Sequence, residues 1–146
     1  MQTQPDFETV YRDTDYRVFT AAHPDVRVLT IDRPSPALAT WMQQHAAATA
    51  AFITACNPLS AVLPDAANAE RMAGLRAALG AAGIRWLPAE GRARSGSHVE
   101  PSLLALGLDL QGAQALMRRY EQHAFLWIEA DGAPRLIWTE GLPPRR

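Results

Sequence analysis

The chain has 146 residues, of which 48% are hydrophobic and 20% are charged, and its net charge is −1 at pH 7. This length and composition are typical of one globular domain with its own core, and the near-zero charge argues against general electrostatic attraction to nucleic acid or an anionic membrane. The absence of lysine from the sequence excludes a Schiff-base lysine for pyridoxal phosphate and the phosphate-binding lysine of a P-loop.

Hydrophobic spacing and turn residues predict four helices and seven strands. In chain order, we expect a helix at 5–13, strands at 16–20 and 26–31, a helix at 35–45, a strand at 50–56, a helix at 65–82, strands at 84–87 and 102–108, a helix at 109–121, and strands at 123–129 and 135–139.

Capping residues set the expected ends of the helices. Ser35, Asp65 and Asp109 are expected N-caps, because their side-chain oxygens can accept hydrogen bonds from the free N–H groups of a first turn. Gly83 is expected to end the longest helix, since glycine readily adopts the left-handed conformation found there. The inward stripe of the last helix is expected to contain Leu110, Ala113, Met117 and Tyr120.

The order of the elements predicts an α+β fold in one domain, residues 1–146. Hairpins are expected at both ends of the chain, and helices connect the strands between them. We therefore expect a single mixed, largely antiparallel sheet with hairpins at both ends, covered by three to four helices. The core is expected over about residues 7–140, with a frayed tail at 141–146. The strand order is left open.

Neither a membrane location nor secretion is expected. The one cysteine, Cys56, excludes an internal disulfide and a zinc site made of several cysteines, and it is expected to be buried packing rather than a nucleophile. No apolar run approaches the roughly 20 residues of a membrane-spanning helix. Residues 1–11 have neither the basic start nor the apolar run of a signal peptide. We expect a cytoplasmic protein.

Polar residues follow the predicted central strand and open a later one. Asn57 and Ser60 come after the carboxyl end of the strand at 50–56, where ligands bind in open sheets. Asn68 shares the inward stripe of the next helix, so it either braces this loop or faces a cavity. Glu100 opens the strand after a polar loop and is suited to act as a general base or a metal ligand. The alternative for Glu100 is a solvated or capping carboxylate.

The polar loop at 91–98 is the most basic stretch of the chain. Arg92 and Arg94 could clamp a phosphate there, and the alternative is a loop that only faces solvent. His98 and Glu100 match half of the zinc deaminase signature, but its Pro-Cys-x-x-Cys half is missing, so we reject that function. His123, after the last helix, is expected either to cap helix carbonyls, to be satisfied in the core or to transfer a proton.

Residues 52–60 read Phe-Ile-Thr-Ala-Cys-Asn-Pro-Leu-Ser. This segment resembles an uncharacterised bacterial family, domain of unknown function 3293, whose pattern carries tryptophan where this chain has Cys56 and an amide-like residue where it has His123. The resemblance extends from about residue 11 to 136 and implies a shared set of polar residues, but no known activity. The matching positions are Thr54, Asn57, Pro58, Ser60, Asn68, Arg71, Glu100, Ser102, Gln122, Ala124 and Trp127.

Our leading hypothesis is a domain that binds a small molecule or nucleotide-type ligand, with or without an enzymatic reaction. Glu100 would be the base or metal ligand, and no further metal ligand or cofactor is indicated. Arg71, Arg92 and Arg94 would bind an anionic group. The pocket is expected to gather Thr54, Asn57, Ser60, Asn68, Glu100, Ser102 and Gln122.

A second hypothesis is a protein-interaction module, such as an immunity, adaptor or regulatory protein, with no small-molecule ligand. Its surface would lie around Trp41, Trp138 or the tail, because tryptophan is common at interface hot spots. Contact with nucleic acid through the arginine loop is a third and weaker hypothesis.

Overall fold

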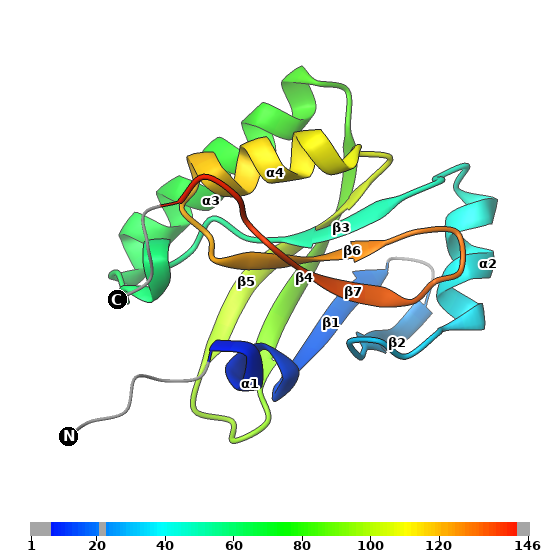
Figure 1. Ribbon diagram of the computed structural model, residues 1–146, viewed down its shortest axis with the longest axis horizontal. Helices are drawn as coiled ribbons and strands as arrows, with labels where there is room; N and C mark the ends of the chain where they lie inside the picture. The colour runs from blue at the N-terminus through cyan, green and yellow to red at the C-terminus, as the bar shows by residue number, and fades with distance from the viewer. Residues whose placement is uncertain (1–6, 21–22, 143–146) are drawn as a thin grey trace.

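The computed structural model describes residues 7–20 and 23–142, in which seven strands form one sheet in the order β2-β1-β4-β5-β3-β6-β7 (Figure 1). The α+β class and the hairpins at both ends of the chain are confirmed. The elements are α1 (Phe7–Arg12), β1 (Thr14–Thr20), β2 (His23–Leu29), α2 (Pro36–Gln44), β3 (Ala50–Ile53), the 3₁₀ helix η1 (Pro58–Ser60), α3 (Asp65–Ala81), β4 (Arg85–Ala93), β5 (Val99–Leu106), α4 (Leu110–Arg119), β6 (Ala124–Ile128) and β7 (Pro134–Trp138).

Every pairing among the described strands is antiparallel. The sheet is therefore not mixed, contrary to the prediction. β3 and β4, which α3 connects, are not neighbours, because β5 lies between them and is antiparallel to both. β5 pairs with β4 as a hairpin and with β3 on its other side. Since β5 and β6 both run opposite to β3, the carboxyl end of β3 lies beside the amino ends of β5 and β6. Ile53 pairs with Leu103, and Phe52 pairs with Leu126.

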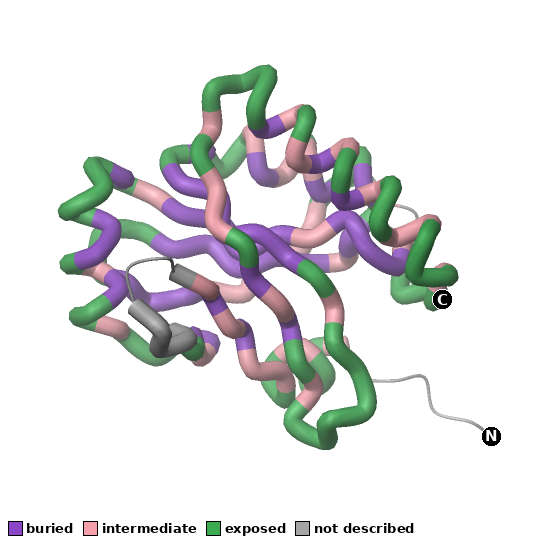
Figure 2. Tube along the Cα trace, turned by 180° about the vertical axis from the view of Figure 1, so that it is seen from behind, coloured by how far each residue is buried: buried purple, intermediate pink, exposed green. Residues whose placement is uncertain are grey.

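Two hydrophobic cores lie on opposite faces of the sheet. α3 and α4 cover one face, where Met72, Leu75 and Met117 are buried, and Figure 1 shows these two helices together on one side. The other face packs against α2, and Trp41 of α2 is buried in that core. The tube in Figure 2 shows the buried residues along the middle strands. Burial of Trp41 removes it from the surface that the interaction hypothesis requires.

Two of the predicted helix caps are confirmed, but the N-cap of α3 and the buried stripe of α4 differ from the prediction. Ser35 accepts from the Leu38 N–H, and Asp109 accepts from the Gly112 N–H, as predicted. α3 instead has Pro64 at its N-cap, so Asp65 occupies the first turn, where its charge is favourable to the helix dipole. Leu110 is 41% exposed rather than buried, because the stripe of α4 that meets the sheet begins one turn later.

The strand ends differ from the prediction where pairing extends or shortens a strand. β4 continues to Ala93 and β5 begins at Val99, because both keep bonding to each other beyond the predicted ends. The expected polar loop at 91–98 is therefore reduced to residues 94–98. β3 ends at Ile53, not at residue 56. Residues 5 and 6 of the predicted first helix, and 143–146 of the predicted tail, lie outside the described residues. No helix in the described part of the chain is long and apolar enough to cross a membrane.

A tight contact at Gly132 generates a first prediction. Gly132 has φ +71°, and a Cβ there would collide with the Ser35 carbonyl oxygen at the start of α2. A left-handed non-glycine residue costs about 1–3 kcal/mol, and the collision adds to it. We expect Gly132→Ala to lower the free energy of unfolding by at least about 2 kcal/mol, or the melting midpoint by roughly 4–8 °C.

The matched control for this prediction is Gly80→Ala, because a Cβ at Gly80 has no neighbour within 4 Å. Alanine is the better helix former by about 0.8–1 kcal/mol, so this variant should melt slightly higher than the parent. Equal midpoints for the two variants would contradict the role given to Gly132.

Candidate functional site

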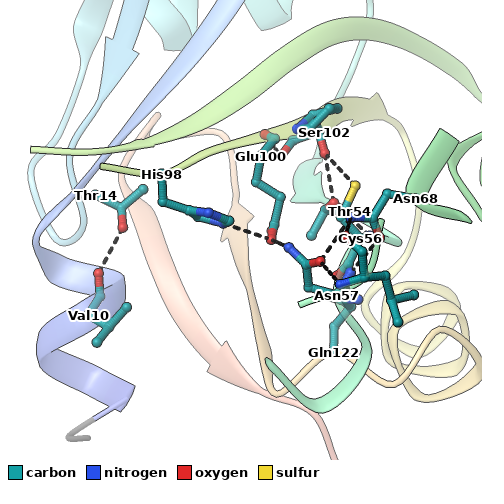
Figure 3. A network of polar contacts seen from close by, with 12 residues as sticks. Val10, Thr14, Thr54, Cys56, Asn57, Asn68, His98, Glu100, Ser102 and Gln122 are labelled. Atoms are coloured by element: carbon teal, nitrogen blue, oxygen red, sulfur yellow. Dashed lines mark hydrogen bonds and ion pairs between the residues drawn. The ribbon is translucent and has the colours of Figure 1, made fainter. Parts of the chain in front are cut away.

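The amide of Asn57 is the centre of a buried polar network at the end of β3 (Figure 3). Its Nδ2 donates to Glu100 Oε2 at 2.9 Å, and its Oδ1 accepts from Asn68 Nδ2 at 2.8 Å and from the Leu63 N–H at 3.0 Å. The Asn57 N–H in turn donates to Asn68 Oδ1 at 2.9 Å. Asn68 thus braces the loop, the first of its two predicted roles, and one side chain joins three separate elements.

The turn after Asn57 has a strained backbone. Asn57, Leu59 and Ser60 have φ values of 52°, 50° and 63°, all in the left-handed region. Asparagine tolerates this region better than most residues, but leucine and serine do so only when their surroundings hold them there. The Leu59 N–H donates to the Glu121 carbonyl at 2.7 Å, which ties this turn to the loop before β6.

The carboxylate of Glu100 is the one acid of this network, and it is partly buried. Its side chain is 24% exposed, and its Oε2 lies 3.5 Å from His98 Nε2 as well as beside the Asn57 amide. Burial raises the pKa of Glu100 above its ordinary value, and the hydrogen bonds from Asn57 and His98 oppose that rise. No donor among the described residues bonds to Oε1. Glu100 is thus equipped to accept a proton or a ligand's hydrogen bond.

A pocket of about 770 Å³ opens beside this network, between α1, the β3 end, the β4–β5 hairpin and the start of β6. Its apolar wall includes Tyr16, Phe52 and Leu126, which belong to the core on the α2 side of the sheet. The residues predicted from the sequence that line it are Thr54, Asn57, Ser60, Arg94, Glu100, Ser102 and Gln122.

Thr54 and Gln122 hold the walls of the pocket together. Thr54 Oγ1 donates to the Pro101 carbonyl at 2.7 Å. Gln122 Nε2 donates to the carbonyls of Cys56 and Tyr120 at 2.9 and 3.1 Å. These bonds occupy the donors of both side chains. No described residue donates to Gln122 Oε1, so this oxygen is the group that Gln122 has left for a ligand.

Three of the predicted binding residues do not line the pocket. Asn68 lies behind Asn57, as described above. Arg71 donates to the carbonyls of Ala55 and Tyr120, each at 2.6 Å, so its guanidinium braces the backbone. Arg92 is half-exposed and lies 3.5 Å from Glu90.

Two histidines line the pocket, although the predicted site does not include them. His98 immediately precedes β5, two residues from Glu100. In an extended chain this spacing puts both side chains on the same side, which is the signal that could have identified His98. The His123 ring packs against Phe7 at 4.6 Å. Its Nε2 is buried, with no hydrogen-bond partner among the described residues, so His123 is not the satisfied core histidine of one prediction.

The remaining chemistry of the site is limited. Cys56 is buried, and burial raises the pKa of its thiol, which fits the predicted packing role. Within residues 7–20 and 23–142, no group of three or more His, Cys, Asp or Glu side chains is arranged to hold a metal ion. Glu100 with His98 remains the pair best placed to accept or move a proton.

The network predicts a stability loss on removal of Asn68. Asn68→Ala leaves the Asn57 N–H without its acceptor and Asn57 Oδ1 without one donor. We expect the free energy of unfolding, measured in urea, to fall by about 1–3 kcal/mol. Gln111→Ala, on the exposed side of α4, is the control and should stay within about 0.5 kcal/mol of the parent. A similar effect of both variants would argue against the network.

The partly buried carboxyl of Glu100 predicts a pH-dependent stability difference. The pKa of Glu100 is raised in the folded state. The protonated carboxyl therefore stabilises the fold below its ordinary pKa, and this stabilisation is lost as the pH rises through the raised pKa. Glu100→Gln removes this loss and keeps an oxygen for the Asn57 amide. We expect the variant to match the parent near pH 4 and to be more stable than it at pH 8 in urea unfolding. A constant difference across this range would contradict the shift.

A protein-family comparison covers the segment that carries this network. The family model described as "Protein of unknown function (DUF3293)" matches residues 53–125, from the last residue of β3 to the second residue of β6. No curated protein and no solved structure matches the chain. The family match spans half of the 146 residues and includes Asn57, Asn68 and Glu100. The chain belongs to the DUF3293 family.

Proposed function

We propose that this protein binds a small organic molecule in the pocket beside Glu100. The observation that supports the proposal most directly is a partly buried carboxylate, held by the neutral amide of Asn57, on the wall of a pocket of about 770 Å³. Ligand sites in proteins have volumes of about 300–1,000 Å³ and combine apolar walls with a few placed polar groups. The walls of this pocket likewise combine apolar side chains with a few polar groups.

The energetics of the site favour a binding role over bracing alone. An ionised carboxylate loses hydration when it is buried, and a strained turn adds about 1–3 kcal/mol for each left-handed residue. Bracing of the loop needs the amides of Asn57 and Asn68 and an acceptor for Asn57 Nδ2, but that acceptor does not have to be a carboxylate. Such unfavourable groups concentrate at functional sites. We therefore assign ligand binding to Glu100.

Proton transfer is the chemistry available if the bound molecule is converted. A carboxylate whose pKa is raised is a stronger base at neutral pH than an exposed one. His98 lies 3.5 Å from it and could relay the proton to solvent, since its side chain is half-exposed. Glu100 is therefore the residue that we assign to catalysis.

Two elements of the earlier hypotheses receive less support. Phosphate binding by arginine would rest on Arg94 alone, because Arg71 and Arg92 are absent from the lining, and Arg94 pairs with Asp15 at 3.2 Å. A protein-interaction module would lack Trp41, which is buried, and Trp138 packs edge-on against Tyr11. The small-molecule function is the one we retain.

The proposal is tested by thermal melting against a panel of nucleobases, amines, organic acids and nucleotides. A ligand at about 100 times its Kd adds about 2.7 kcal/mol, so the midpoint should rise by roughly 5–11 °C. Gly91 lines the pocket, and a Cβ there would contact only Thr14 Cγ2, at 3.5 Å. Gly91→Leu should fill the space and abolish the rise, while Gly91→Ala should retain most of it.

The contradicting outcomes are distinct. If no compound moves the midpoint, or if the rise survives in folded Gly91→Leu, the pocket is not the site. Circular dichroism of both Gly91 variants shows whether the fold is kept. A partner protein recovered by the parent chain and equally by Gly91→Leu would favour the interaction module.

A further inference from the structure

We infer that the pocket selects an organic cation, a protonated amine or an amidinium group attached to a flat apolar body. The cationic group would lie between the carboxylate of Glu100 and the ring of Tyr16. This inference rests on the proposed function and adds the chemical class of the ligand.

The backbone register places a gap between these two side chains. Tyr16 of β1 pairs with Gly91 of β4, and Gly91 pairs with Glu100 of β5. Directly paired residues of antiparallel strands point to the same face of a sheet. Their backbones span two strand spacings, about 10 Å. Because Gly91 has no side chain, the space between the ring and the carboxylate stays open on the pocket side.

The aromatic side of the gap is held in a fixed orientation. The Tyr16 hydroxyl donates to the Tyr11 carbonyl, and its ring meets the Phe52 ring edge-on at 5.1 Å. Burial, and after it the charges of Tyr11 and Glu100, raises the pKa of the Tyr16 hydroxyl, so the hydroxyl stays neutral and lies within the electrostatic reach of the carboxylate. An aromatic face and a carboxylate both attract cations.

The carboxylate of Glu100 has His98 beside it but no arginine paired with it. Besides Glu100, the ionisable side chains on the lining include Asp13 and Arg94 together with the two histidines and two tyrosines described above. Arg94 pairs with Asp15 outside the lining. Two acids therefore face a pocket whose one arginine already has a partner. A ligand with a positive charge would restore the balance.

Two carboxyl and amide oxygens of the wall are free to accept. Glu100 Oε1 and Gln122 Oε1 receive no hydrogen bond from the described residues, while both N–H donors of the Gln122 amide and one of the two on Asn57 already donate to protein acceptors. A ligand rich in N–H groups would bond to these oxygens. A ligand rich in acceptors would leave them buried and unpaired, which costs about 1–3 kcal/mol for each group.

Three probes of nearly equal size and shape test the charge: benzamidine, benzamide and benzoate. Binding is measured by NMR titration of the full chain at pH 8, because a higher pH favours the ionised form of Glu100, whose pKa is raised. We expect benzamidine to bind at least tenfold more tightly than benzamide, and benzoate to bind more weakly than either. Glu100→Gln should reduce benzamidine affinity at least tenfold. Glu129→Gln, an exposed acid outside the pocket, should leave it unchanged.

Several results would overturn the cation inference: equal affinity for benzamidine and benzamide, tighter binding of benzoate, no binding of any probe, or loss of benzamidine binding in Glu129→Gln. If Glu100→Gln does not fold, Gly91→Leu replaces it, and binding of benzamidine that persists in this variant overturns the inference as well. A neutral or acidic compound that binds the parent but not Gly91→Leu would refute the cation and leave the proposed function standing. Failure of every compound in both experiments refutes both.

Discussion

The amide of Asn57 is the interaction on which the arrangement of this site depends. An amide has donors and an acceptor on one rigid plane, so Asn57 can hold α3 through Asn68, the Leu63 backbone and the carboxylate of Glu100 at once. An aspartate could not donate to Glu100, and an apolar residue could bind none of the three. Asn57, Leu59 and Ser60 keep a left-handed backbone because these contacts hold the turn in place.

The path of β5 converts this local network into the edge of a pocket. β5 lies antiparallel between β3 and β4. The last residue of β3 pairs with Leu103, so the first residues of β5 extend past the end of β3 to the turn that follows it. A parallel strand in the same place would bring its carboxyl end to this edge and would carry Glu100 to the other end of the sheet. The family match begins at Ile53 and ends at Phe125, and it therefore spans the elements that create this juxtaposition.

Stability and the proposed function oppose one another at Glu100. The fold surrounds the carboxylate with apolar and neutral groups, which raises its pKa and makes the charged form less favourable. The same surroundings strengthen any bond that the carboxylate makes to a ligand, because the electrostatic screening by water is weaker there. Gly91 shows the same opposition. A larger residue there would add packing to the core, but it would close the gap between Tyr16 and Glu100.

The sequence by itself determined the features that depend on neighbouring residues: the α+β class, the caps at Ser35 and Asp109, and the choice of Asn57 and Glu100 as polar residues beside apolar strands. These follow from side-chain period and from hydrogen bonds within a few residues. Only the tertiary structure decided that Arg71 braces a backbone and that α1 joins the pocket wall. Their partners lie across strands or on distant loops, and strand register and packing, which local patterns do not encode, bring them together.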